Sequence, residues 1–451
     1  MSLPCITPSS AAVETLRPAQ NILRNTALLQ FPRKSIHGGA VLANGESEEL
    51  EQTGSFGLLQ INTYLQNIGF PLKGVTVTIS ESDSGTLLTE LQTDEEGKLP
   101  PVRLPSPPES YAQSPDEPRP FSQYDVRAQA DGFEEAYISN VQIYADTTAV
   151  QNIFMTSADD TVIIPYPTLW GNFPPKIPES AIKRLPFPGN LVVLPEPVVP
   201  EYIVVHNGVP SDSSAANYTV RFKDYINNVA SSEIYASWNK EALKANILAI
   251  ISFTLNRVYT EWYRSKGYDF TITNSTAYDQ AFTYGRNIFQ EIEEITDEVF
   301  NLYISKSDVN QPLFTQYSDG RRVVRDGWLS QWGSQELASQ GYSAIQILRY
   351  YYGYEIILRQ ARSVQGIPIS FPGILQIGSR GENVRTIQRQ LNAVARNYPL
   401  INRLVADGIY GEKTAQSVRT FQRIFTLPVT GVVNFPTWYK ISDVFNAVSA
   451  R

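Results

Sequence analysis

Alternating hydrophobic and polar residues indicate β-structure in the first third of the chain. Val75, Val77 and Ile79 alternate with threonine and serine, which is the pattern of a strand with one buried face. The same two-residue period returns at 124–130, and an Asp-Glu-Glu-Gly turn lies between the two runs. We therefore predict a small β-sandwich over residues 51–156.

The period changes to that of a helix in the second half. Asn239 is a good N-cap for a long helix whose apolar residues recur from Leu243 to Trp262, and shorter helical runs follow. These runs predict a mainly helical domain over residues 201–365. Three further amphipathic segments predict a three-helix unit over residues 366–451, so the fold class is multidomain α+β.

Two other segments lack a sustained period. Residues 1–50 have mixed polarity and are predicted to be a leader or pro-segment. Residues 157–200 are rich in proline, which disfavours both helix and central strand, so we predict a connector. Its aromatic residues Trp170, Phe173 and Phe187 would be poorly solvated, and we expect the connector to wrap around a neighbouring domain.

The residue counts limit the chemistry that is available. The 451 residues include one cysteine, Cys5, and two histidines, His37 and His206. An intrachain disulfide and zinc sites built from cysteines or three histidines are therefore excluded, and we predict neither metal nor cofactor. Acid–base chemistry is left to carboxylates. The longest apolar stretch, residues 245–256, is too short to cross a bilayer, and no secretory signal is visible near the start.

The net charge of −8 hides an uneven distribution. Residues 46–135 contain 17 acidic and 5 basic side chains, or −12, whereas residues 371–451 contain 10 basic and 4 acidic side chains, or +6. The acidic overall balance argues against nucleic acid as a partner. The basic tail favours an anionic partner for that unit, although small helical domains also differ this much by chance.

The C-terminal unit contains the most specific motifs. It has Gly-Ser-x-Gly at 378–381, Asp-Gly-x-Tyr-Gly at 407–411, Phe421-Gln422 and Thr437-Trp438. This set resembles the peptidoglycan-binding domain type 1 family and departs from it in having Thr430 where aspartate is frequent. The resemblance implies binding to bacterial cell-wall peptidoglycan, while most motif residues serve the fold.

Three blocks in the preceding domain resemble the catalytic domain of the SpoIID/LytB family of sporulation peptidoglycan hydrolases. They are DYINNVASSEIYASWNKEALKANILAIISFTLNRV from 224, STAYDQAFTYG from 275 and WLSQWGSQELASQGYSAIQILRYYYG from 328. The β-sandwich itself resembles prealbumin-like modules. The whole order of modules resembles the spore cortex-lytic enzymes of clostridia. That resemblance implies a zymogen, an activating protease, and a place in the spore cortex or cell wall of a spore-forming Gram-positive bacterium.

The resemblance implies that Glu233 is catalytic. In a lytic transglycosylase one carboxylic acid protonates the glycosidic oxygen, then accepts the proton of the muramic acid 6-hydroxyl, and a 1,6-anhydro product forms. Glu233 follows an apolar helix near Tyr225, Tyr235 and Trp238, surroundings that favour the protonated form. The alternative interpretation is a solvated glutamate at a helix end.

The same family blocks suggest further site residues. Gln280 and Gln331 can donate to and accept from sugar hydroxyls, Asp279 can orient a neighbour, and Trp332 can stack on a pyranose ring or pack in the core. We therefore predict Asp279, Gln280, Gln331 and Trp332 as substrate-binding residues.

Three functions remain open at this point. The first is a peptidoglycan lytic transglycosylase, and the second is a non-catalytic wall-binding or spore structural protein. The third is a muramidase-type hydrolase, which needs a second acid such as Asp279 beside Glu233.

Overall fold

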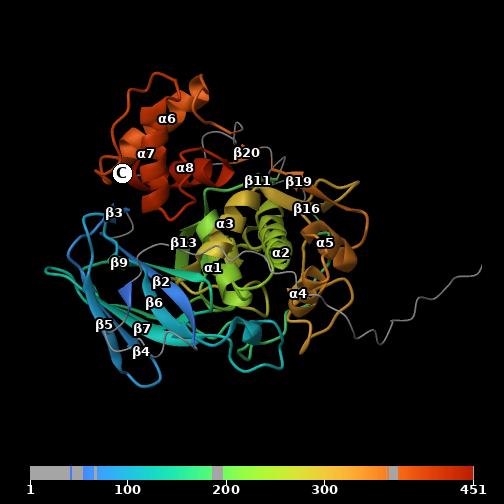
Figure 1. The fold of residues 1–451 in the computed structure, drawn as a ribbon. Helices are drawn as coiled ribbons and strands as arrows, with labels where there is room; N and C mark the ends of the chain where they lie inside the picture. The colour runs from blue at the N-terminus through green and yellow to red at the C-terminus, as the bar shows by residue number, and fades with distance from the viewer. Residues whose placement is uncertain are drawn as a thin grey trace, which may run out of the picture. The chain divides into compact units, whose positions relative to one another are not determined.

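The computed structural model describes residues 41–42, 54–65, 69–184, 197–361, 363–364 and 374–449 (Figure 1). Gly39–Arg451 forms one compact unit. Most of the predicted leader lies outside the described residues, as do Cys5, His37 and Phe187.

Two sheets make up the N-terminal module. The first has the order β1 (Val41–Leu42), β6 (Val102–Ser106), β2 (Ser55–Leu65), β9 (Thr148–Met155) and β15 (Ile288–Phe289), with β3 (Phe70–Pro71) paired to β2. The second has the order β10 (Asp160–Ile163), β8 (Ala136–Ile143), β7 (Ser122–Gln129), β4 (Thr76–Glu81) and β5 (Leu87–Gln92). A short 3₁₀ helix, Glu109–Ala112, precedes β7.

The core of this module comes from alternate residues of both sheets. Leu59 and Ile61 of β2 and Val77, Ile79 and Val126 of the second sheet are all fully buried in one hydrophobic cluster. The period of two therefore predicted the buried face of these strands correctly. The prealbumin-like topology stays a prediction.

The sandwich and the next module share a sheet. Strand β15, which lies in the following module, pairs antiparallel with β9 through Ile288↔Val150 and Phe289↔Ala149. The ring of Phe289 is fully buried and meets Tyr144 edge-on at a centroid distance of 5.2 Å. Because backbone pairing and core packing both cross this junction, the two modules should unfold together.

Residues 197–361 combine helices with short strands. The helices are α1 (Phe222–Glu233), α2 (Lys240–Tyr259), α3 (Gln290–Val299), α4 (Gln331–Ser339) and α5 (Ala344–Tyr352). The strands are β11 (Val198–Val199), β12 (Tyr202–His206), β13 (Asn217–Arg221), β14 (Ile272–Thr273), β16 (Leu302–Lys306), β17 (Tyr317–Ser318), β18 (Leu329–Ser330) and β19 (Ile356–Gln360), and β20 (Ser363–Val364) pairs with β11. The prediction of a mainly helical domain therefore describes only part of this module.

Helix α2 is the centre of this module. It contacts α1, α3, α4, α5 and β16, and most of its residues are buried on every side. The Asn239 side chain accepts a hydrogen bond from the Glu241 amide, which confirms the predicted N-cap. A helix that is apolar around its whole circumference needs such neighbours to be stable in water.

The C-terminal unit contains α6 (Glu382–Val394), α7 (Glu412–Ile424) and α8 (Phe435–Ser449). Two glutamines hold its turns. Gln388 donates to Asp407 Oδ1 at 3.0 Å and accepts from the Gly408 amide at 2.9 Å, and Gln422 accepts from the Gly431 amide at 2.8 Å. Gly408 has a φ of 77°, which suits glycine. These motif residues therefore serve the fold, as expected.

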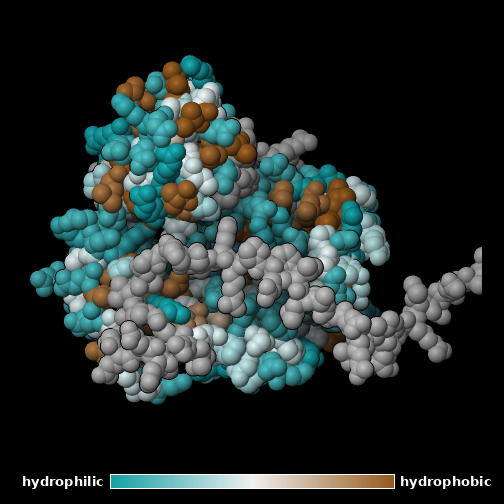
Figure 2. Space-filling view, viewed as in Figure 1, coloured by the Kyte–Doolittle hydropathy of each residue, from teal (hydrophilic) through white to brown (hydrophobic). Residues whose placement is uncertain are grey.

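Hydrophobic residues on the face shown in Figure 2 occur in small groups between hydrophilic ones. Among the described residues, none of the helices combines the length and the apolar character that crossing a bilayer requires.

We expect Phe289→Ala to lower the free energy of unfolding by about 3–5 kcal/mol, because it leaves a cavity where the two modules meet. Thermal unfolding followed by circular dichroism and by tryptophan fluorescence measures this change. Both signals should shift together. Tyr354→Ala is the control, since that side chain is 84% exposed. Separate transitions for the two probes would contradict a shared core.

Candidate active site

Glu233 is the last residue of α1 and is 1% exposed. Its Oε1 accepts a hydrogen bond from the Ala281 amide at 2.8 Å. Among the described residues, none lies at the distance and angle of a hydrogen bond to its Oε2. Burial raises the pKa of the carboxyl group, and the nearby Lys176 ammonium, Tyr317 hydroxyl and Ala281 amide lower it by less. This environment differs from that of a solvated glutamate at a helix end.

A small cavity of about 90 Å³ lies at this carboxyl group. Its lining includes Lys176, Tyr317, Thr276 and Gln331 beside Glu233. Pockets that hold drug-sized ligands begin at about 300 Å³, so this cavity is too small for a glycan strand. The site is therefore closed in this structure.

Residues 165–177, here called the strap, cover the cavity. The Thr168 amide donates to the Ser232 carbonyl at 2.9 Å, and the Ile177 amide donates to the Ala277 carbonyl at 2.7 Å. Phe173 of the strap also lines the cavity. This part of the predicted connector thus packs over Glu233, although Trp170, one of the aromatic residues behind the expectation, is 38% exposed.

Arg322 ties the strap to the opposite side of the cavity. Its guanidinium donates to the carbonyl oxygens of Thr168 and Gly171 and forms an ion pair with Asp319. Asp319 in turn accepts from the backbone amides of Arg321 and Arg322, both at 3.1 Å. The loop after β17 is therefore organised around this arginine.

Lys176 at the end of the strap lines the same cavity as the Glu233 carboxyl group. Its Nζ lies 3.6 Å from the centroid of the Tyr317 ring, a cation–π contact. Burial lowers the pKa of Lys176, and the charge of Glu233 opposes that effect. The strap thus brings a cationic side chain close enough to Glu233 to lower the pKa of that carboxyl group.

Gln280 lies behind the site. Its Oε1 accepts from the hydroxyls of Tyr225 at 3.0 Å and Thr254 at 2.9 Å, and its Nε2 donates to the Tyr317 hydroxyl at 3.1 Å. All of these groups are buried. Gln280 therefore orients Tyr317 toward Glu233, and its predicted contact with substrate stays a prediction.

Asp279 is fully buried and has four hydrogen bonds. They come from Arg257 Nε at 2.7 Å, the Tyr263 hydroxyl at 2.7 Å, and the amide and hydroxyl of Thr273 at 2.9 and 2.7 Å. Arg257 also pairs with Glu179 at 2.7 Å, just beyond the strap. Asp279 thus holds the arginine that anchors this segment, and its predicted role toward substrate remains untested.

The remaining two predicted residues open α4. Gln331 lines the Glu233 cavity and is 2% exposed. Trp332 packs in an aromatic cluster with Tyr235 at 5.7 Å and Trp238 at 5.1 Å between ring centroids. The structure therefore brings Gln331 to the Glu233 cavity, whereas the ring of Trp332 packs in the aromatic core.

The sequence did not single out Lys176 or Tyr317. Lys176 lies in a proline-rich segment without a period, and Tyr317 lies outside the three blocks that carry the family resemblance. His206 stacks on Phe270 at 4.4 Å, and its Nδ1 lies 2.8 Å from Asn217 Oδ1, a structural role. The described part of the chain contains no cluster of three His, Cys, Asp or Glu side chains able to hold a metal ion.

Two family matches agree with this division of the chain. Residues 211–301 match the family described as Stage II sporulation protein, and residues 380–441 match the putative peptidoglycan binding domain. One segment of the chain is thus similar to the first family and another segment to the second. The first segment contains Glu233, Asp279 and Gln280. Residues 331 and 332 follow it.

Comparison with curated proteins gave no match. Among solved structures, the SleB N-terminal domain is 27% identical, and the alignment covers 17% of this chain and 99% of that chain with a TM-score of 0.15. The 3-chlorocatechol 1,2-dioxygenase of Rhodococcus opacus 1CP is 12% identical over 30% of this chain and 69% of that chain, with a TM-score of 0.17. Scores this low carry no argument about fold or function.

We expect Lys176→Met to raise the pKa of Glu233, because the positive charge that favours the carboxylate is removed. Infrared difference spectroscopy on protein with isotope-labelled glutamate follows the carboxyl band across pH. Lys176→Arg keeps the charge and is the matched control. An unchanged carboxyl titration in the Met variant would show that Lys176 does not act on Glu233.

Proposed function

We propose that this protein is a peptidoglycan lytic transglycosylase that cleaves the MurNAc–GlcNAc β-1,4 bond. The observation that carries the proposal is the Glu233 carboxyl group, buried in a cavity where its pKa is raised. A carboxyl group with a raised pKa stays protonated closer to neutral pH and can act as a general acid. Both family matches support peptidoglycan as the polymer.

The proposed reaction needs one carboxyl group. Protonated Glu233 donates its proton to the glycosidic oxygen while the bond from the muramic acid C1 to that oxygen breaks. The 6-hydroxyl of the same muramic acid attacks C1, and its proton passes to the Glu233 carboxylate. The products are a 1,6-anhydro-muramic end and a free GlcNAc end, no water is consumed, and Glu233 regains its starting state.

The state of the neighbouring carboxylates supports this route over hydrolysis. A muramidase needs a second carboxylate to serve as nucleophile or base. Asp279 is occupied by four hydrogen bonds, and Asp319 is occupied by Arg322 and backbone amides. Hydrolysis and a purely binding role remain as alternatives that product analysis separates.

The closed cavity supports synthesis as a zymogen. The strap is held by Arg322 and by backbone hydrogen bonds to Ser232 of α1 and to Ala277. It covers Glu233 and leaves too little room for a sugar ring. We propose that an activating protease triggers release of the strap. The cell wall or spore cortex of a spore-forming Gram-positive bacterium is the proposed location, and the proposed chemistry needs no cofactor.

We expect Glu233→Gln to reduce glycan cleavage by about 10²–10⁴-fold, since the amide can neither donate nor accept the transferred proton. The measurement is mass analysis of muropeptides released from purified cortex or vegetative peptidoglycan. Glu336→Gln on the exposed face of α4 is the control and should cleave normally.

The products of this assay decide among the three functions. Anhydro-muramic ends that disappear in the Gln variant agree with a transglycosylase. Reducing muramic ends indicate a muramidase, and absence of products even after strap release indicates a binding protein.

We expect Arg322→Ala to increase cleavage by the full-length protein severalfold, because the strap loses its side-chain contacts with the loop after β17. Arg321→Ala is the matched control: this neighbour forms an exposed pair with Asp116 and does not touch the strap. If Arg322→Ala cleaves no faster than wild type and Arg321→Ala, the strap is not what keeps the glycan from Glu233.

A further inference from the structure

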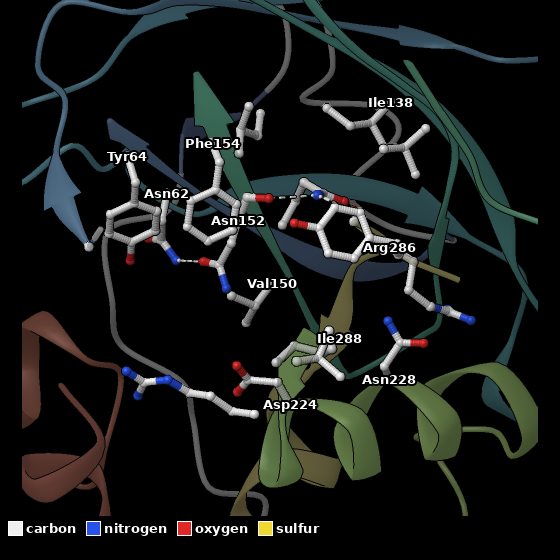
Figure 3. A pocket seen from close by; sticks show the side chains of 18 of the residues that line it. Asn62, Tyr64, Ile138, Val150, Asn152, Phe154, Asp224, Asn228, Arg286 and Ile288 are labelled. Carbon is white, nitrogen blue, oxygen red and sulfur yellow. Dashed lines mark hydrogen bonds between the residues drawn. The ribbon is translucent and has the colours of Figure 1, made fainter. Parts of the chain in front are cut away.

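A second and much larger cavity, of about 660 Å³, lies away from the Glu233 cavity. Strands β2 and β9, helix α1 and the segment after Phe282 border it, and residues of the C-terminal unit also contribute (Figure 3). Its volume falls within the range of about 300–1,000 Å³ that is usual for ligand sites. No step of the proposed reaction uses it.

The same short motif occurs on both strands at this cavity. β2 carries Asn62-x-Tyr64 and β9 carries Asn152-x-Phe154. The two strands are parallel, with Asn62 opposite Asn152 and Tyr64 opposite Phe154. Because alternate residues share a face of a sheet, all four side chains lie together. We call these four residues the amide–aromatic tile.

Contacts within the tile fix the positions of its side chains. Asn62 Nδ2 donates to Asn152 Oδ1 at 2.9 Å, and the rings of Tyr64 and Phe154 stack at 5.5 Å with planes 27° apart (Figure 3). Tyr64, Asn152 and Phe154 are only half-buried. No described residue accepts a hydrogen bond from Asn152 Nδ2, so this donor faces the cavity region without a protein partner.

Helix α1 forms the opposite side. Asp224 and Asn228 lie across the cavity from the tile (Figure 3), and Asn228 is held by Thr283 through bonds of 2.7 and 3.0 Å. Glu233 ends the same helix nine residues after Asp224, which is roughly 14 Å along the axis. One rigid element therefore connects the large cavity to the catalytic carboxyl group.

The charges around the cavity balance. Four cationic and four anionic side chains line it, namely Lys98, Arg221, Arg286 and Lys440 against Asp159, Asp160, Asp224 and Glu293. A ligand with several carboxylates, such as a stem peptide, would favour an excess of positive charge. Amides and aromatic rings without net charge instead suit a neutral polyhydroxylated ligand, whose C–H faces stack on rings and whose hydroxyl and acetamido groups bond to amides.

The C-terminal unit reaches the same place. Tyr398 and Phe425 line the cavity, and the Tyr398 hydroxyl hydrogen-bonds that of Tyr64. Burial raises the pKa of Tyr64 to about 12, so its hydroxyl stays protonated. Segments matched to the sporulation and the peptidoglycan-binding families both border this cavity. Their common polymer is thus the ligand that the surroundings favour.

We propose that this cavity is a second, non-catalytic binding site for the N-acetylated glycan strand of peptidoglycan, with the amide–aromatic tile as its binding surface. This identity of the polymer rests on the proposed function. The site gives the β-sandwich a role in substrate binding. It would hold a neighbouring stretch of glycan while α1 presents Glu233 to the bond that is cleaved.

The test is binding of the tetrasaccharide of N-acetylglucosamine to the full-length protein, measured by calorimetry. Phe154→Ala should weaken the Kd by about tenfold because a stacking surface is lost. Asn152→Asp, which keeps the side-chain volume, should weaken it by a similar factor because the Nδ2 donor is lost. Tyr342→Ala, a surface aromatic outside the cavity, should bind as wild type does. Unchanged melting temperatures establish that each variant is folded.

Hydrogen–deuterium exchange locates the bound sugar. Protection of β2 and β9 is the expected result. Protection confined to residues 374–449, wild-type affinity in both tile variants, or binding of free stem peptide in place of the sugar would each overturn the proposal. The Glu233→Gln variant should bind with wild-type affinity. If the tile variants bind as wild type does while Glu233→Gln abolishes cleavage, this inference alone is refuted. If the tile variants weaken binding while Glu233→Gln cleaves as wild type does, the proposed function alone is refuted.

Discussion

Burial of one carboxyl group is the constraint on which the rest of this structure depends. A charged Glu233 would be costly at 1% exposure, so the surroundings favour the protonated acid. The Ala281 amide, Tyr317 and Lys176 limit that preference without removing it. The segments that contain Ala281, Tyr317 and Lys176 are far apart in the sequence and come together at the end of α1. The packing of α2, the hydrogen bonds of Gln280 and the path of the strap hold them there.

The strap that helps to bury Glu233 also covers the cavity at its carboxyl group. In the proposed reaction Glu233 must meet a glycan, and the strap covers the cavity in which Glu233 lies. Arg322 of the loop after β17 and the backbone bonds of Thr168 and Ile177 hold the strap in place, and Leu169 of the strap packs in the hydrophobic core.

Local patterns predicted much of the fold. The alternation around Val77 predicted the buried face of a strand, and Asn239 predicted the start of α2, because strand period and helix capping depend on near neighbours. Resemblance to a family pointed to Glu233, Gln280 and Gln331, and all three lie in or directly behind one site. Lys176 and Tyr317 could not be predicted. Each affects Glu233 from more than fifty residues away in the sequence, and neither its residue type nor its spacing indicates that contact.

The sequence by itself predicted the order of the modules. It determined the scarcity of thiol and imidazole groups, which leaves acid–base chemistry to carboxylates. Only the tertiary structure decided that the proline-rich connector lies over Glu233 and that Asp279 is taken up by Arg257. It also decided that two Asn-x-aromatic motifs ninety residues apart form one surface. The physical reason is that composition and period report local free energies, whereas pKa shifts, cavities and paired side chains arise from long-range packing.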